Sequence, residues 1–153
     1  MSIRNDQLPP TLATLPELVA GLRRELSELR AALPDLSAAC GLLPPLDADL
    51  TRWPQTSLTS WTTIAQASNI RWKSKLRLSL LTATSGGGAG NVRVLVDGAP
   101  WGPTVVAGAA LDYTGPLPAA TPLGGQYLLA VQAQRTSGAG TVHAQVQLIN
   151  SLP

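Results

Sequence analysis

The chain has 153 residues, of which 44% are hydrophobic and 13% are charged, and its formal net charge is +2. That hydrophobic share supports a folded core, and the weak net charge argues against a protein held on nucleic acid by a general basic field. A single cysteine and a single histidine exclude an intrachain disulfide and leave too few ligands for a zinc site within one chain.

The N-terminal stretch MSIRNDQLPPTLAT, residues 1–14, is polar and contains two adjacent prolines. It lacks the apolar core of a secretory signal, and no stretch of the chain reaches the roughly 18 apolar residues of a membrane-spanning helix. Its prolines favour an extended peptide. We therefore expect a chain that is made in the cytoplasm, inserts in no membrane and begins with an extended segment.

A repeating pattern begins at residue 15, where apolar side chains recur at alternating spacings of three and four. This is the a and d pattern of a coiled coil. Thr14 and Glu17 fit a capping box, and Pro16 falls in the first turn, where its missing N–H is harmless. Because proline interrupts a helix, we predict a coiled-coil helix over residues 15–42 with a break at Pro34. The expected interface residues are Leu15, Leu18, Val19, Leu22, Leu26, Leu29 and Leu33.

This apolar face needs a partner, because a helix of about 18 residues is marginally stable alone. Glu25 at a g position and Arg30 at the following e position have the spacing that pairs charges across a parallel coiled coil. Leu18 widens the face, which favours three or more helices or packing on a globular core. We expect a homo-oligomer, with a trimer favoured, and keep as the alternative a helix that covers its own domain.

Residues 43–58 contain several prolines and show no periodicity, so we expect a linker there. From residue 59 the apolar period becomes two. The run IRWKSKLRLSLL, residues 70–81, predicts a strand with one buried face. Further alternating runs, separated by turn signals such as Asp97-Gly98, bring the number to six or seven strands with no helix between them. We predict an α+β fold, in which the helix precedes an all-β antiparallel sandwich or jelly roll over residues 59–153.

Four cations alternate along the predicted strand, at Arg71, Lys73, Lys75 and Arg77. On one strand face they would stand about 6.5–7 Å apart, which suits an anionic polymer or an acidic partner. The other interpretation is a solvated face whose charges suppress edge-to-edge pairing.

Two of the four tryptophans, Trp53 and Trp101, stand beside prolines and glycines in predicted loops. Loop tryptophans stack on sugars in glycan-binding proteins, and they also fill the end of a sandwich or anchor a subunit interface. We keep both possibilities, a glycan contact and a buried or interface position.

Few residues offer chemistry within one chain. His143 is accompanied by no nucleophile elbow, so we interpret it as a solvent-facing or interface residue of the last strand. Asp47 and Asp49 fit a helix cap or a loop more readily than a calcium pair. The glycines near residue 88 precede no Lys-Ser/Thr pair that opens a helix, which argues against a phosphate-binding loop. We predict no catalytic residue, no cofactor and no metal.

The polar peptide MSIRNDQLPPTLAT, the heptad helix and the Gly/Thr-rich β domain together resemble small bacteriophage virion proteins, such as tail spikes, tail-tip proteins, short fibres and head decorations. The resemblance covers the whole chain as architecture, and bacterial surface modules share the plan. It implies a homotrimer in which the helices align the subunits and the β domains display a surface. It also implies that residues 1–14 dock on other virion proteins.

The function expected from this resemblance is that of a non-enzymatic virion structural protein, located in the phage tail or capsid. The first alternative is a carbohydrate-binding or adhesion module that contacts a cell-surface glycan. The second is a small hydrolase. We expect no nucleic-acid partner.

Overall fold

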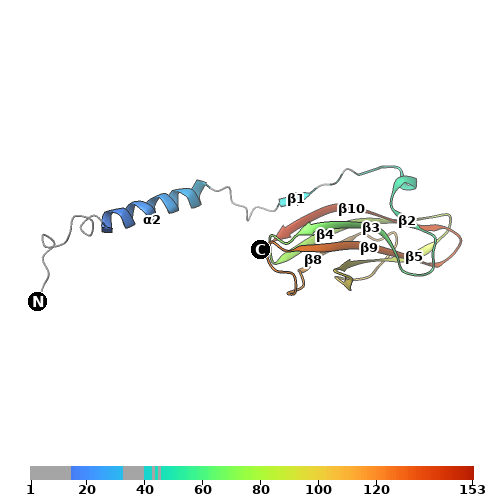
Figure 1. Ribbon diagram of the computed structural model, residues 1–153. Helices are drawn as coiled ribbons and strands as arrows, with labels where there is room; N and C mark the ends of the chain where they lie inside the picture. Colours follow the sequence, from blue (N-terminus) through green and yellow to red (C-terminus); the bar gives the residue numbers. More distant parts are fainter. Residues whose placement is uncertain (1–14, 33–39, 43, 45) are drawn as a thin grey trace, which may run out of the picture. The chain divides into compact units, whose positions relative to one another are not determined.

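The computed structural model describes residues 15–32, 40–42, 44 and 46–153. The chain divides into two compact units, residues 1–38 and 39–153, and each is described here by itself (Figure 1). The first contains one helix, and the second contains all the strands in the described part of the chain.

The helix α2 runs from Leu15 to Ala32. Its first residue is the one predicted from the capping signals, and it ends two residues before Pro34, where the missing N–H and the ring clash oppose a helix. Glu17 lies in the first turn, where a carboxylate suits the positive end of the helix dipole. At about 1.5 Å per residue, the helix is about 27 Å long.

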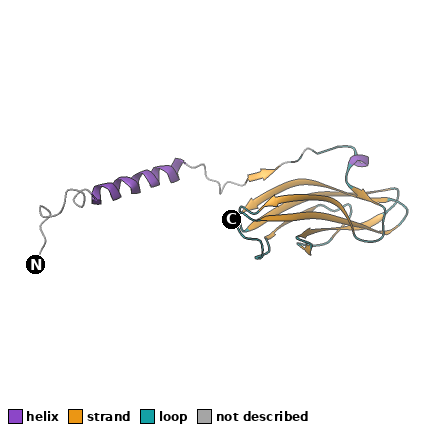
Figure 2. Cartoon of the chain, viewed as in Figure 1, coloured by secondary structure: helices purple, strands orange, loops and turns teal. Residues whose placement is uncertain are grey.

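The second unit is an antiparallel β-sandwich, as predicted (Figure 2). Each of its two sheets has five strands, more than the six or seven strands expected in all. In the first sheet the strand order is β1-β10-β4-β8, and β2 also pairs with β10. These strands are β1 (Cys40–Leu42), β2 (Gln55–Thr56), β4 (Lys75–Ser85), β8 (Leu111–Pro116) and β10 (Thr141–Leu152). In the second sheet the order is β3-β9-β5-β6, and β7 also pairs with β5. Its strands are β3 (Thr62–Ile70), β5 (Ala89–Val96), β6 (Ala99–Pro100), β7 (Val105–Val106) and β9 (Gln126–Ser137).

The core lies between the two sheets and follows the period of two. Alternate residues of the central strands are buried, because successive side chains of a strand point to opposite faces. The first sheet contributes Leu76, Leu78, Leu80, Leu111, Val142 and Ala144, and the second contributes Val92, Val94, Val96, Tyr127, Leu129, Val131 and Ala133.

The predicted helix does not extend to residue 42. Cys40, which lies within the predicted helix, opens strand β1 and lies opposite Ser151 of β10. The edge of β10 offers unpaired backbone groups, and Cys40–Leu42 pairs with them. This pairing prevails over the helical spacing of the apolar residues in the sequence. The remainder of the predicted second helical segment, residues 33–39, lies outside the described residues.

The predicted linker over residues 43–58 is also partly structured. A short 3₁₀ helix, η2 (Leu50–Arg52), is followed by strand β2. Asp49 caps η2, because its carboxylate accepts a hydrogen bond from the Thr51 amide at 3.0 Å. Since Gln55 of β2 lies opposite His143 of β10, this segment belongs to the sandwich.

The predicted strand over residues 70–81 is two strands in different sheets. β3 ends at Ile70, and β4 begins at Lys75. The Arg71 amide still donates to the Gly125 carbonyl, so the chain follows β9 to this point and then crosses to the other sheet. Trp72, expected on the buried face, is 65% exposed in this crossing.

Candidate functional site

The surface of α2 carries an apolar stripe whose members recur at spacings of three and four. Leu18 and Leu22 are exposed by 60% and 66% of their surface in the helical unit described by itself. The leucine stripe is defined here by the described side chains Leu15, Leu18, Val19, Leu22 and Leu26. Of the other expected interface residues, Leu29 lies in α2, but its side chain is outside the described part, and Leu33 is outside it altogether.

The leucine stripe is suited to association. Moving one leucine side chain from water into an apolar contact contributes about 1.5–3 kcal/mol. The opposite surface of the helix is polar, with Arg24 and Glu28 forming an ion pair at 3.9 Å. Both of these side chains are strongly exposed, so their pairing adds little to helix stability.

The four predicted cations do not form one row. Arg71 lies in the crossing between the sheets, where its Nη1 donates to the Pro118 carbonyl at 2.8 Å and also to the Thr121 carbonyl. Its guanidinium therefore fixes the loop over residues 117–125. The prediction of one cationic strand face is wrong, because the period of two continued by coincidence through a segment that leaves the sheet.

The second arginine of that set is also paired. Arg77 on β4 bonds Asp112 on the neighbouring strand β8 through two hydrogen bonds, of 2.7 and 3.0 Å. The hydrogen bond from Arg77 is the main cause that lowers the pKa of Asp112. Lys73 and Lys75 have no ion pair within the described residues, and two cations are too few for a polyanion groove.

The two tryptophans singled out from the sequence lie in different surroundings. Trp101 is 7% exposed, its Nε1 donates to the Pro116 carbonyl at 2.8 Å, and its ring meets Tyr113 edge-on with centroids 4.8 Å apart. It is a core residue, and its ring face is closed to a sugar. Trp53 is half-buried, and its Nε1 donates to the Asp47 carbonyl at 2.7 Å.

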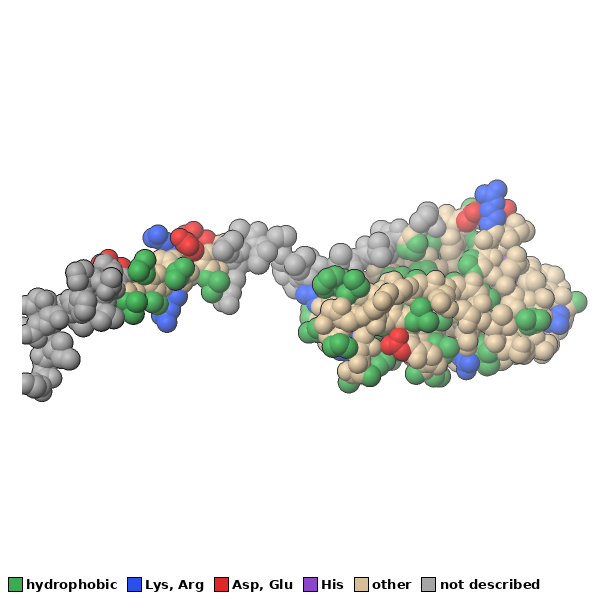
Figure 3. Space-filling model, viewed as in Figure 1, with side chains coloured by type: hydrophobic (Ala, Val, Ile, Leu, Met, Phe, Trp, Pro, Cys, Tyr) green, Lys and Arg blue, Asp and Glu red, His purple; other side chains and the backbone are tan. Residues whose placement is uncertain are grey.

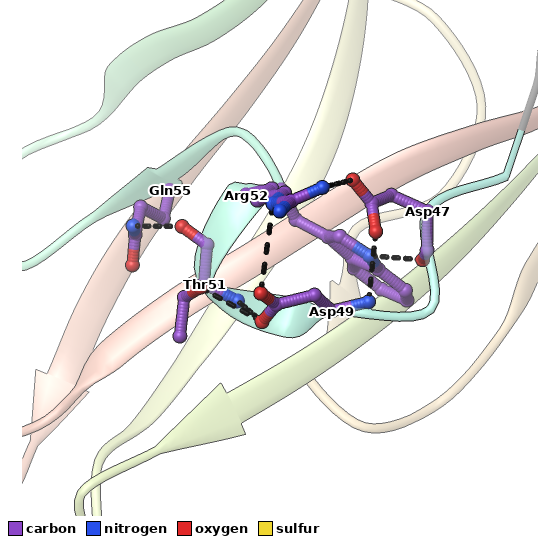
Figure 4. Close-up of polar contacts among 6 residues, drawn as sticks. Asp47, Asp49, Thr51, Arg52 and Gln55 are labelled. Carbon is purple, nitrogen blue, oxygen red and sulfur yellow. Dashed lines mark hydrogen bonds and ion pairs between the residues drawn. The ribbon is translucent and has the colours of Figure 1, made fainter.

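Asp47 and Asp49 belong to a polar network around η2 that includes Thr51 and Arg52 (Figure 4). Asp47 accepts a hydrogen bond from the Asp49 amide, and Arg52 lies 3.6 Å from both carboxylates. The hydrogen bond from the Thr51 side chain is the main cause that lowers the pKa of Asp49. These carboxylates stabilise η2, and no group of three or more potential metal ligands occurs among the described residues.

His143 is buried rather than solvent-facing, with 2% of its surface exposed. Its Nε2 lies 2.9 Å from Ser85 Oγ and 2.6 Å from Thr141 Oγ1. Strand β2, which pairs beside it, was expected as linker, and so the burial could not be foreseen. A hydroxyl beside an imidazole resembles two members of a nucleophilic triad, but the buried Nδ1 has no hydrogen-bond partner in the described structure. No third group therefore orients the imidazole there.

Sequence reasoning missed an apolar surface at one end of the sandwich. The corner patch is defined here by Ile70, Trp72 and Leu123, which are 44%, 65% and 70% exposed. Ile70 ends β3, Trp72 lies in the crossing, and Leu123 lies in the turn before β9. The Pro122-Leu123-Gly124 sequence marks a turn but gives no signal that its leucine faces solvent.

Comparison with protein families, curated proteins and solved structures found no match to this chain. Over the described residues, no helix has the length and apolar character required to cross a membrane. The leucine stripe, the sandwich and the corner patch are the features of this chain that bear on its function.

Proposed function

We propose that the chain is a non-enzymatic virion structural protein, a subunit of a bacteriophage tail or capsid fibre, spike or decoration. It forms a homotrimer through α2 and displays its β-sandwich. The observation that carries the proposal is the leucine stripe, a continuous apolar surface on an 18-residue helix. An isolated helix of this length has little stability of its own, so the stripe needs a partner.

Identical copies are the simplest partner for such a stripe. A 3-4 spacing keeps the same face toward the axis of a coiled coil, and Glu25 and Arg30 flank it at the positions that pair charges between parallel helices. Leu18 adds a g position to the a and d residues. The apolar face is then wider than a two-helix seam, and this favours three helices.

The sandwich suits display because the end at which β4 and β9 terminate is tightly packed. The loops after β4 and β9 pack against each other, so that a Cβ at Gly140 would lie 1.5 Å from the Ser85 carbonyl oxygen. Gly86 and Gly138 have φ of 62° and 73°, which side-chain-bearing residues seldom adopt. Residues 1–14, outside the described part, act in this proposal as the peptide that docks on other virion proteins.

The mass of the full chain in solution tests the proposal. The wild type is expected at three times the mass of one chain at micromolar concentration. Leu26→Asp places a carboxylate in the seam, and it should give a monomer whose sandwich remains folded by circular dichroism. Ser27→Asp is the matched control, because it adds the same charge at the adjacent exposed position outside the stripe, and it should remain trimeric. A monomeric wild type contradicts the proposal.

The carbohydrate-binding alternative depends on accessible aromatic faces. Trp101 offers none, and Trp53 is half-buried and tied to Asp47. An exposed aromatic platform at either residue is what this alternative needs, so it is the weaker of the two proposals. A glycan array probed with wild type and with Trp53→Ala distinguishes the two functions. Only a carbohydrate-binding module should give a signal that is lost in Trp53→Ala.

A further inference from the structure

The corner patch brings together apolar side chains from two stretches of the chain, residues 70–72 and the turn that contains Leu123. The Arg71 amide donates to the Gly125 carbonyl, and the Gly124 amide donates to the Arg71 carbonyl. These two bonds place Leu123 beside Trp72, with Ile70 at the end of the adjoining strand. Figure 3 shows apolar side chains exposed at the end of the sandwich where Figure 1 places the C terminus.

The loop that carries Leu123 is held in place by polar contacts. The Arg71 guanidinium binds the loop carbonyls of Pro118 and Thr121. From the other side, the Asp97 carboxylate accepts hydrogen bonds from the Thr121 hydroxyl at 2.9 Å and the Leu128 amide at 2.8 Å. Since the loop is already ordered, a contact at the patch loses little conformational entropy.

The chain enters the sandwich at the same end. Cys40, the first residue of β1, lies opposite Ser151, and Leu152 lies opposite Lys75, the first residue of β4 after the crossing. Only residues 33–39 separate α2 from β1, and seven residues span at most about 25 Å. In an assembly joined through α2, these ends of the sandwiches are therefore kept close together, at a high effective concentration.

We propose that Ile70, Trp72 and Leu123 form a second self-association surface, which contacts the same end of a neighbouring copy in the trimer. Trp72 is its anchor, because a large exposed aromatic contributes most when it is buried at an interface. The inference rests on the proposed function, since α2 supplies the tether. Three side chains cover far less than the roughly 1,200 Å² of a stable independent interface, so the patch suits a tethered copy better than a free partner.

The lysines beside the patch predict how the contact responds to salt. Lys73 and Lys75 have no ion pair within the described residues. In a symmetric contact they approach their own copies, and like charges repel until salt screens them. The contact between copies should therefore strengthen as ionic strength rises, whereas a contact with an acidic partner would weaken.

Crosslinking of the full chain tests this surface. In a Cys40→Ser background, Ser74→Cys places a thiol at an exposed position beside the patch and keeps Ile70, Trp72 and Leu123. Treatment with a short bismaleimide should give covalent dimers and trimers, in higher yield at higher salt. The matched control adds Trp72→Ala to this variant, because it keeps the tether and the thiol and removes only the anchor. It should give several-fold less product. Adding Leu26→Asp to the Ser74→Cys variant should abolish the crosslinking.

The outcomes separate the two proposals. If the variants remain trimeric while Trp72→Ala leaves the crosslinking yield of the Ser74→Cys variant unchanged, the corner patch is not a self-contact, and the helical trimer stands. If the wild type is monomeric, both proposals fail. A yield that falls with rising salt would overturn the contact between like copies.

Discussion

Arg77 and Asp112 form a two-bond ion pair across neighbouring strands, with Nε to Oδ1 at 3.0 Å and Nη2 to Oδ2 at 2.7 Å. The pair joins the central strand β4 to the edge strand β8, and both side chains are about half exposed. Two parallel hydrogen bonds fix the guanidinium against the carboxylate more firmly than a single contact. This fixed geometry explains why the pKa of Asp112 is lowered and that of Arg77 is raised.

The ion pair predicts a pH-dependent effect of Asp112→Asn. Because the carboxyl pKa is lower in the folded chain, its stabilising contribution is present above the ordinary aspartate pKa of about 4, and it disappears as the pH falls through the folded value. Asp112→Asn should therefore lower the midpoint of thermal unfolding slightly at neutral pH. The difference between wild type and variant should shrink as the pH falls below about 4. A constant difference across this range would contradict the explanation, and Arg77→Gln serves as the reciprocal variant.

A second prediction concerns Tyr127 at alkaline pH. Burial, and secondly the charge of Asp97, raise the pKa of its phenol. Because the phenol pKa is higher in the folded chain, its contribution to folding stability is fully present below the ordinary tyrosine pKa of about 10. That contribution is lost as the pH rises through the pKa of the folded state. In an alkaline titration followed by tyrosinate absorbance, Tyr127 should ionise late. Tyr127→Phe should remove that step, leave Tyr113 as the remaining tyrosine, and reduce the loss of stability above about pH 10. If Tyr127→Phe instead removes a titration step near the ordinary tyrosine pKa of about 10, Tyr127 is not buried.

The elements that local patterns specify were predicted from the sequence. The first turn of α2 carries its own capping and proline signals, and the buried leucines of β4, Leu76, Leu78 and Leu80, alternate as written in the chain. These signals concern a residue and its near neighbours, so they survive in the folded chain. The antiparallel sandwich followed from the number of alternating runs and the absence of helices between them.

The pairing of distant segments was not predictable in this way. The period of two gives the phase of a strand but not its end, and nothing in residues 70–75 marks the crossing that separates Arg71 from Arg77. The pairing of Cys40 with Ser151 depends on an edge that exists only after the sandwich has formed. The corner patch depends on the same crossing, which explains why Trp72 was assigned to the core.

A third prediction concerns the glycine loops that follow β4 and β9. A Cβ at Gly140 would overlap the Ser85 carbonyl, so Gly140→Ala should lower the free energy of unfolding by about 3 kcal/mol or more. Gly87→Ala is the comparison, because Gly87 has φ of 71° but no atom within 4 Å of its Cβ position. It should cost about 1–2 kcal/mol from backbone strain alone. Urea unfolding measures both, and equal losses would mean that the loops do not touch.

Two tryptophans of the sandwich should respond to truncation by very different amounts. Trp101 fills the core and donates to the Pro116 carbonyl, so Trp101→Ala should lower the free energy of unfolding by about 3–5 kcal/mol. Trp72 is largely exposed. In the monomeric Leu26→Asp background, Trp72→Ala should therefore change the free energy of unfolding by about 0.5 kcal/mol or less. Urea unfolding followed by circular dichroism compares the two without relying on tryptophan fluorescence. A large loss for Trp72→Ala in that background would place its ring in the core of a single copy, and the corner patch would then have no anchor to offer a neighbour.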